Sequence, residues 1–274
     1  MSDLWSDLLA CLDLREQPST GTAAFEGPNQ RLSYHRLFGG QLLAQFVRAA
    51  SLAGQGAGES PGKAVKSLHV LFPRAGRTDE PVRYEAERVH EGGTFATWSL
   101  VARQPAGVIA TASVSLHASE EGLDHQTCPP APPVPGREHQ VELDLLPWET
   151  RTATDLDAAA PGAPELDLWM RTPRVAADLA PALLAYATDL TVIGTALRPL
   201  DGISQRDAGR VFTSAVTSHT VWFHRPFRTD DWLLLRQHAP LLAHGRGYGR
   251  GDVLTRNGSL VASYAQEALV RFTP

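Results

Sequence analysis

The sequence predicts an α+β protein made of two similar halves, each with a central helix wrapped by an antiparallel sheet. In each half, a strand-like piece and a helix precede four strand-like stretches. SLHVLF, which ends at Phe72, corresponds to SHTVWF, which ends at Phe223, and GVIATASV from Gly107 corresponds to GSLVASYA from Gly258. Both matches lie at an offset of about 150 residues and in the same order. This repetition indicates an internal duplication.

The first half is expected to cover residues 1–118. It opens with a helix whose leucines and Trp5 form one apolar stripe. The run Phe38–Gly54 predicts the central helix, and Gly39 and Gly40 suit a turn whose backbone comes close to a neighbour before that helix begins. Extended segments are expected at Ala23–Glu26, Leu32–His35, Val65–Phe72, Val82–His90, Thr94–Arg103 and Gly107–Leu116.

Residues 119–165 are predicted to be a surface connector, because they hold eight of the 20 prolines and ten acidic residues against two arginines. The second half, residues 166–274, repeats the order of the first. Its central helix is expected at Leu179–Leu197. Its strands are expected at Leu166–Arg171, Arg210–His224, Trp232–His238, Gly245–Thr255 and Ser259–Phe272.

Composition excludes several classes of protein. The chain has 274 residues and a net charge of −5, so no basic field favours nucleic acid. Its two cysteines, Cys11 and Cys128, form no disulfide framework, and no Cys/His spacing suggests a metal site. The acidic N-terminal residues do not resemble a signal peptide. We therefore expect a cytoplasmic protein with no metal and no cofactor.

The helix Leu179–Leu197 carries one charge in its interior, Asp189. On a helical wheel this carboxylate lies in an apolar stripe with Ala182, Ala185, Tyr186, Val192, Ile193 and Ala196. The segment is long enough to cross a bilayer, but its mid-segment Asp, its Pro and its Gly indicate a core helix instead. A buried charge costs several kcal/mol unless it is hydrogen-bonded. Asp189 is thus either a structural residue that ties down a neighbouring backbone or a functional one.

Two other patterns carry candidate site residues. In GRGYGRG, residues 245–251, strand alternation places Arg246 and Arg250 on one face, where they either meet solvent or bind phosphate. The glycines on the other face indicate close passage of a helix or a ligand. In the final strand, Gln266 is a polar amide on a mostly apolar face.

Together these residues resemble the type II acyl-CoA thioesterases, TesB and its relatives, which carry two hotdog folds in one chain. The resemblance rests on FEGPNQ, FGGQLLAQ, GLDHQT, YATDLTVIGTALRP, HTVWFHRPF, DDWLLL and GSLVASYAQEALV, and covers nearly the whole sequence. It implies a duplicated hotdog fold that hydrolyses acyl-CoA to free acid and CoA.

The resemblance also implies the site residues. In the family, an Asp in the second helix, a Gln in the final strand and a Ser or Thr in the strand before Trp-Phe-His together orient a water. Asp189 and Gln266 match the first two. At the hydroxyl position this chain has Val216, followed by Thr217 and Ser218. By strand alternation Ser218 shares the face of Val216, whereas Thr217 points away unless a bulge turns it. Ser218 is therefore the preferred replacement.

In the mechanism expected from these residues, Asp189 is the base and Gln266 positions the water. A backbone N–H at Gly39 or Gly40 faces the carbonyl oxygen. The candidate contacts to the rest of the substrate are His69, His219, Arg246 and Arg250. Because the first helix contains no acidic residue, one active site per chain is expected, between the halves.

The leading prediction is thus a fatty acyl-CoA hydrolase of lipid metabolism, with acyl-CoA as its partner and no nucleic acid or membrane. Two alternatives stay open. Val216 suggests a catalytically weakened acyl-CoA-binding protein. A hotdog enoyl-CoA hydratase would instead combine an acid with His69 or His219. Because hotdog sheets join edge to edge, a homo-oligomer is also expected.

Overall fold

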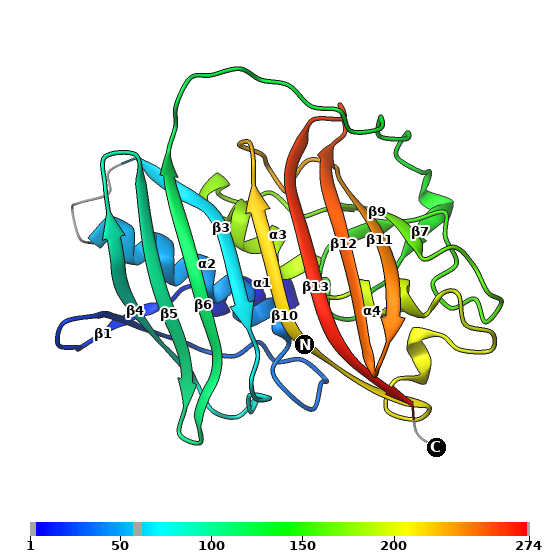
Figure 1. Cartoon of the computed structure of the whole chain (residues 1–274), viewed down its shortest axis with the longest axis horizontal. Coiled ribbons are helices and arrows are strands. Elements are labelled where there is room, and N and C mark those ends of the chain that lie inside the picture. Colours follow the sequence, from blue (N-terminus) through cyan, green and yellow to red (C-terminus); the bar gives the residue numbers. More distant parts are fainter. Residues whose placement is uncertain (1–3, 57–61, 273–274) are drawn as a thin grey trace. The chain divides into compact units, whose positions relative to one another are not determined.

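The computed structural model describes residues 4–56 and 62–272 (Figure 1). The chain divides into two compact units. The first comprises Met1–His125 and Pro181–Tyr186, and the second comprises Gln126–Ala180 and Ala187–Pro274. The boundary after His125 falls inside the predicted connector, so most of that connector belongs to the second unit.

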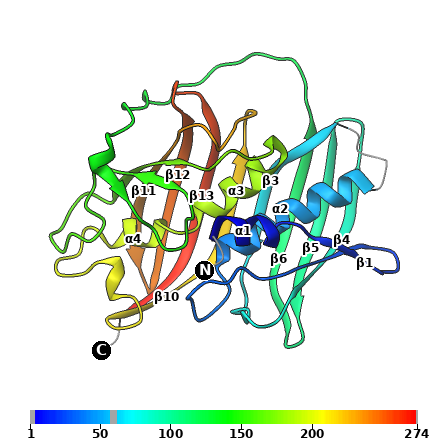
Figure 2. The same ribbon diagram turned by 180° about the vertical axis from the view of Figure 1, so that it is seen from behind.

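The first unit is an antiparallel sheet with a helix along one face. The strand order is β1-β2-β4-β5-β6-β3. These strands are β1 (Arg15–Gln17), β2 (Ala23–Gly27), β3 (Lys63–Leu71), β4 (Val82–Glu91), β5 (Phe95–Gln104) and β6 (Gly107–Ala118). Helix α1 (Leu4–Cys11) precedes them, and α2 (Gly39–Gly56) follows β2. Helix α2 lies behind β4, β5 and β6 in Figure 1 and in front of them in Figure 2.

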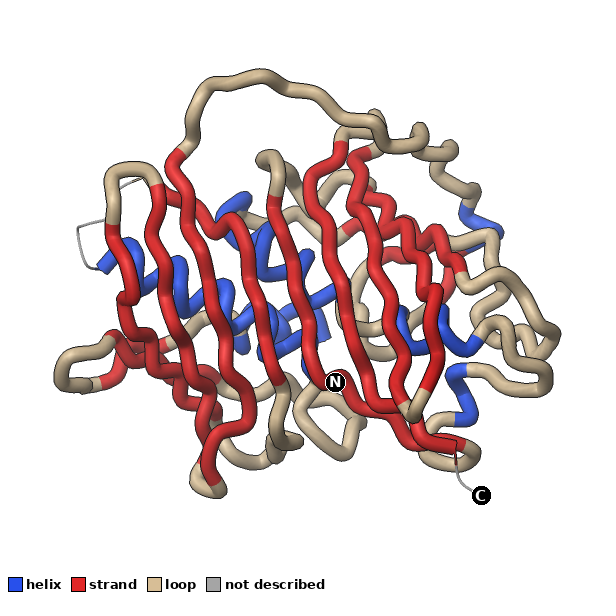
Figure 3. The backbone as a smooth tube through the Cα atoms, in the orientation of Figure 1, coloured by secondary structure: helices blue, strands red, loops and turns tan. Residues whose placement is uncertain are grey.

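The second unit repeats this plan, with the order β10-β13-β12-β11-β9-β8-β7. Its strands are β7 (Gln140–Val141), β8 (Glu149–Arg151), β9 (Glu165–Arg171), β10 (Phe212–Phe223), β11 (Leu233–Ala243), β12 (Arg246–Thr255) and β13 (Leu260–Phe272). Short 3₁₀ helices lie at Arg137–His139, Ala177–Leu179 and Gln205–Asp207. Helix α4 (Val192–Leu197) packs on β11 and β12, and α3 (Ala180–Thr188) contributes residues to both units. Figure 3 distinguishes these helices from the strands.

The duplication is confirmed at the level of single residues. The order β2-β4-β5-β6-β3 of the first unit recurs as β9-β11-β12-β13-β10 in the second. Even a defect recurs: the register of β3 shifts between Val65 and Ser67, and that of β10 between Val216 and Ser218. Each unit therefore has the predicted hotdog plan, and each carries a β-bulge at the same place.

Two local predictions are corrected. Leu32–His35 forms bends rather than a strand. The connector, for which no strand was predicted, supplies β7 and β8, which extend the sheet beyond β9. Peptide groups near a sheet edge gain partners by joining the ladder, which outweighs the weak strand propensity of this segment.

The connector is tied to the second unit by side chains. Gln126, from the GLDHQT run, donates Nε2 to the carbonyl of Gly258 at 2.8 Å and accepts from the backbone N–H of Leu260 at 3.0 Å. The two Nη atoms of Arg236 donate to the carbonyls of Pro129 and Pro130, both at 3.0 Å. The proline-rich stretch is thus fixed along β11, although proline itself offers no N–H donor.

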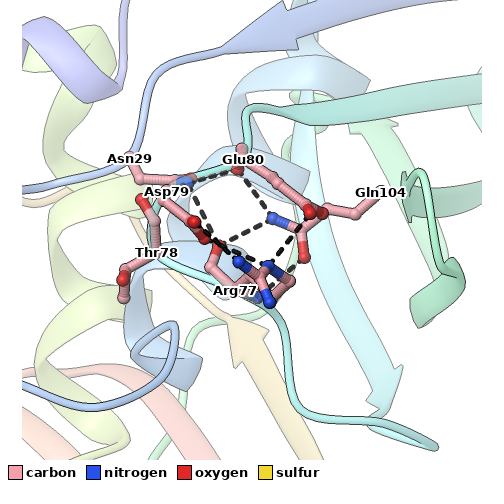
Figure 4. Close-up of polar contacts among 6 residues, drawn as sticks. All are labelled: Asn29, Arg77, Thr78, Asp79, Glu80 and Gln104. Carbon is pink, nitrogen blue, oxygen red and sulfur yellow. Dashed lines mark hydrogen bonds and ion pairs between the residues drawn. The ribbon is translucent and has the colours of Figure 1, made fainter.

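A loop of the first unit is held by two amide side chains (Figure 4). Asn29 donates Nδ2 to the carbonyl oxygens of Thr78, at 3.1 Å, and Glu80, at 2.5 Å. Gln104 donates Nε2 to the carbonyls of Arg77 and Glu80 and accepts from the Arg77 backbone N–H. These bonds satisfy peptide groups that no strand ladder reaches. Asn29, part of the FEGPNQ motif, therefore has a structural role.

The glycine face of β12 packs against α4, as the alternation in GRGYGRG predicts. Gly247, Gly249 and Gly251 are buried, whereas Arg246 and Arg250 are exposed on the opposite face. A Cβ added at Gly249 would lie 2.5 Å from Cγ1 of Val192. We call the helix-covered side of each sheet its inner face and the opposite side its outer face.

Gly249→Ala is expected to lower the free energy of unfolding by about 1–3 kcal/mol, because its methyl group would overlap the stiff β-branched side chain of Val192. Gly93→Ala is the matched control, since a Cβ there meets nothing within 4 Å. Urea unfolding of both variants measures the difference. Equal stabilities would contradict the close passage of α4 over this glycine.

By length and composition, Ala177–Leu197 is the one helical stretch among residues 4–56 and 62–272 that could cross a membrane. However, 72% of its apolar window is buried inside the structure. This burial is that of a core helix, in agreement with the interpretation made from the sequence.

Candidate active site

The helix that was predicted to be continuous from Leu179 to Leu197 is broken at Asp189. Helix α3 ends at Thr188 with Asp189 as its C-cap, and α4 begins at Val192 after the N-cap residue Thr191. The wheel correctly predicts that Asp189 is buried, since its exposed fraction is 4%. It misses the break, which places the carboxylate at a helix end rather than on a helix face.

Tertiary hydrogen bonds hold the break open. Gln237 of β11 donates Nε2 to the hydroxyl of Thr191 at 2.5 Å and accepts from the hydroxyl of Thr195 at 3.0 Å. The carbonyl of Leu190 accepts from Nε2 of Gln205 at 3.4 Å. Gln205 thereby gives the Leu190 carbonyl a partner at the break, and Gln237 anchors the first turn of α4 through its two threonine hydroxyls.

Asp189 lies in a buried polar cluster with Thr188, His219 and Gln266. Nδ1 of His219 is 3.9 Å from Oδ1 of Asp189 and 3.0 Å from Oε1 of Gln266. Nε2 of His219 is 3.0 Å from the hydroxyl of Thr188. His219 and Gln266 are each 1% exposed, and their residues face each other across β10 and β13. All four side chains belong to the second unit.

His219 is neutral in this environment. Burial lowers its pKa from 6.5 to about 4, and the hydrogen bond with Gln266 opposes this shift only in part. A neutral imidazole has one N–H donor and one acceptor nitrogen. Both ring nitrogens therefore have a protein partner, one as donor and the other as acceptor.

Among its described residues, the first unit has no counterpart of this cluster. The pair His219 and Gln266 of β10 and β13 takes the register position that Leu68 and Val114 take in β3 and β6. Leu68 and Val114 are fully buried. The fold therefore accommodates an apolar pair at this position. Folding alone does not require the polar pair of the second unit, so we look for a functional reason.

The bulge in β10 changes the assignment of the hydroxyl. Thr217 is the extra residue, Val216 faces Ala268, and Ser218 faces Glu267. Directly opposed residues point to the same side of a sheet, so Ser218 lies on the outer face with Glu267. The expectation that Ser218 shares the face of Val216 is therefore wrong, because regular alternation does not survive the bulge.

Thr217 lies within this bulge and stabilises it. Its hydroxyl donates to the carbonyl of Glu267 at 3.0 Å. Without the bulge, His219 would face outward, since a shift of one residue reverses every side chain.

Thr217→Ala is expected to lower kcat about fivefold, because the lost hydrogen bond, worth about 1 kcal/mol, helps to direct His219 inward. Thr217→Ser keeps the hydroxyl and is the matched control. Ser218→Ala is expected to change kcat less than twofold. Thiol release from an acyl-CoA measures all three. A larger loss for Ser218→Ala than for Thr217→Ala would contradict the assignment of faces.

The remaining candidates do not join the cluster. His69 is exposed on the outer face of the first unit, and Arg246 and Arg250 are exposed on the outer face of the second. Arg246 pairs with Glu267 at 3.0 Å. Their roles as contacts to the rest of the substrate stay predictions.

Gly39 and Gly40 form the first turn of α2 rather than a turn before it. A Cβ at Gly40 would lie 2.5 Å from the carbonyl oxygen of Tyr186. The close approach predicted for this pair is therefore one to a helix backbone within the first unit, which by itself requires glycine. The proposed carbonyl contact of these N–H groups stays a prediction.

Thr188 is the cluster residue that sequence reasoning missed. Its position before Asp189 in the YATDL motif was visible, but a threonine at the end of an apolar helix has no distinctive pattern. His219 was expected to contact substrate, and the structure instead gives both of its nitrogens protein partners. Within the described residues, no group of three or more His, Cys, Asp or Glu side chains forms a metal site.

Within the described residues, the fold is a duplicated hotdog with an Asp-His-Gln cluster buried in its second unit. The model of the acyl-CoA thioesterase N-terminal domain matches residues 29–117, and that of the C-terminal domain matches residues 120–270. The chain belongs to the acyl-CoA thioesterase family and is a thioester hydrolase.

Full-length relatives agree with this assignment. Acyl-CoA thioesterase 2 of Haemophilus influenzae is 29% identical over 303 residues, which cover all of both chains. The crystal structure of the acyl-CoA thioesterase II TesB2 of Mycobacterium marinum is 31% identical, with a TM-score of 0.77 over 97% of each chain. The tesB protein of Mycobacterium avium subsp. paratuberculosis is 28% identical, with a TM-score of 0.78 over 98% of this chain and 100% of that one.

Proposed function

We propose that Asp189 and Gln266 hydrolyse the thioester of fatty acyl-CoA by activating a water molecule. The observation that carries this proposal is the buried cluster itself. Gln266 Nε2 has no hydrogen-bond partner among the described residues, although the side chain is 1% exposed. A buried amide donor left without a partner costs about 1–3 kcal/mol, which bound water or substrate would recover.

In the proposed reaction, the water donates one hydrogen bond to the Asp189 carboxylate and accepts another from Gln266 Nε2. The water oxygen attacks the carbonyl carbon, and Asp189 takes the proton as the C–O bond forms. The tetrahedral intermediate then breaks its C–S bond, and the leaving thiolate recovers the proton from Asp189. One acyl-CoA and one water yield one acid and one CoA thiol.

The position of Asp189 supports the role of base. The carboxylate is buried and stands at the C-terminal end of α3, where the helix dipole is negative. The carboxylate thus stands at the break between α3 and α4, beside the amide that would hold the water. The relatives described above are named acyl-CoA thioesterases, which fits the same reaction.

A second candidate is an acyl-CoA-binding protein with weakened catalysis. It is favoured by Val216, which faces Ala268 where the family's hydroxyl is expected. An enoyl-CoA hydratase would need a His that can exchange a proton with substrate. In this structure both nitrogens of His219 are engaged by protein groups, Thr188 and Gln266.

One assay separates these functions. The full chain is incubated with saturated acyl-CoAs of increasing length, and released thiol is followed with a chromogenic disulfide, while enoyl-CoA is followed by its absorbance. Catalytic thiol release over many turnovers supports hydrolysis. Saturable binding without turnover would favour the binding protein, and loss of enoyl absorbance without thiol would favour the hydratase.

Three finer points belong to the same proposal. The family description supports acyl-CoA as the substrate class, and a fatty acyl group is our proposal for its acyl part. A cytoplasmic location is supported by the free thiols of Cys11 and Cys128. Self-association of the chain is also proposed, and light scattering of the purified chain tests it.

A further inference from the structure

Because the fold is duplicated, the polar cluster of the second unit can be compared with the same positions in the first unit. In the first unit the inner-face pair is Leu68 and Val114, and in the second the same register holds His219 and Gln266. Both nitrogens of His219 already have hydrogen-bond partners within the protein. Because this histidine lies beside the candidate catalytic amide of Gln266, we ask whether it acts by orienting that amide.

The surroundings of His219 select one tautomer. Oδ1 of Asp189 lies 3.9 Å from Nδ1, so a lone pair on Nδ1 would face a carboxylate, whereas an N–H there would be stabilised by it. The proton therefore belongs on Nδ1. On the other side, Nε2 accepts from the hydroxyl of Thr188 at 3.0 Å.

This tautomer fixes the orientation of Gln266. An N–H at Nδ1 needs an acceptor, so Gln266 must present Oε1, which lies 3.0 Å away. The two N–H bonds of its Nε2 are then turned away from His219. If the amide were flipped, Nε2 would meet the Nδ1–H donor, and two donors would oppose each other in a buried site.

We propose that His219 is a positioning residue that, supported by Thr188, locks the Gln266 amide with its Nε2 donors toward the reacting water. This inference rests on the function proposed above, since it assigns no chemistry of its own to His219. The histidine acts only through Gln266.

The first test observes the tautomer without any reaction. The full chain is labelled with ¹⁵N-histidine, and long-range ¹H–¹⁵N correlations at pH 7 report which nitrogen of each ring carries the proton. The chain has 10 histidines, and the His219 signals are those missing from His219→Leu. The expected form is protonated at Nδ1. Protonation at Nε2 alone would overturn the proposal.

The second test uses the residue that the first unit itself has at this position. His219→Leu is expected to lower kcat for acyl-CoA hydrolysis about 10–100-fold and to leave KM within about threefold, because a misplaced reacting group slows the chemical step rather than binding. His219→Asn places an amide N–H near the site of Nδ1 and is expected to stay within about fivefold of the wild-type kcat. If Asn and Leu lose activity equally, the donor role is wrong.

A double-mutant cycle tests whether His219 acts through Gln266. Gln266→Val introduces the apolar partner found in the first unit. The double variant, His219→Leu with Gln266→Val, is expected to be no slower than Gln266→Val alone, because the amide to be oriented is already gone. If the two losses multiply, His219 has an independent role and the proposal fails.

The outcomes also separate this inference from the proposed function. If Asp189→Asn abolishes hydrolysis while His219→Leu retains full kcat, the function stands and the positioning role is overturned. If Asp189→Asn is fully active, the proposed function fails first. The tautomer measurement is independent of both results, since it needs no turnover.

Discussion

Asp189→Asn is expected to lower kcat for acyl-CoA hydrolysis by about 10²–10⁴-fold, the usual contribution of a positioned general base. Asparagine preserves the size of the side chain but cannot accept the proton of the attacking water. KM is expected to change little, because the carboxylate contacts the water rather than the CoA moiety. Steady-state thiol release at several acyl-CoA concentrations measures both constants.

Asp178→Asn is the matched control for this substitution. Asp178 is exposed in the 3₁₀ turn before α3, eleven positions ahead of Asp189, and the same charge is removed there. Its kcat should stay within about twofold of wild type. A loss of less than threefold for Asp189→Asn would exclude general-base catalysis by this residue.

The second large effect concerns stability and pH. The pKa of His219 falls from 6.5 to about 4 on folding because the ring is buried. Well above pH 6.5, His219 is neutral in both the folded and the unfolded chain, so its titration does not change the free energy of unfolding. As the pH falls from 6.5 towards 4, the unfolded chain binds a proton that the folded chain excludes, so stability decreases. At pH 4 this loss amounts to about 3 kcal/mol.

His219→Leu isolates this contribution, because every other titrating group stays in place. The carboxylate that faces the ring is that of Asp189, whose Oδ1 lies 3.9 Å from Nδ1 of His219. Between pH 7 and pH 4, the wild type should lose about 3 kcal/mol more of its free energy of unfolding than the variant loses, as measured by urea unfolding. Parallel pH curves would mean that His219 is not buried in its neutral form.

Much of the fold followed from the sequence because the relevant signals are local. The long strands and α2 begin and end within a few residues of the predicted bounds, and the duplication was readable from two pairs of matching strands. The alternation in GRGYGRG correctly predicted a face of bare backbone with a helix or a ligand close to it, and the structure has helix α4 there.

The candidate site was predictable only in part. Asp189 and Gln266 stood out as polar groups in apolar patterns, and the structure places both in one buried cluster with His219. Thr188 and the role of His219 were not visible, because a hydrogen bond between residues 31 positions apart leaves no periodic trace.

The sequence alone thus determined the α+β class, the duplication and the burial of Asp189, since each depends on the periodicity of apolar residues. Only the tertiary structure decided where the helix breaks and which side chains of β10 point to the inner face of the sheet. The break depends on Gln237, 46 positions from Thr191, and the bulge at Thr217 depends on pairing with β13. Such contacts reverse the direction of a side chain without changing the local pattern, and so they turn His219 inward and Ser218 outward.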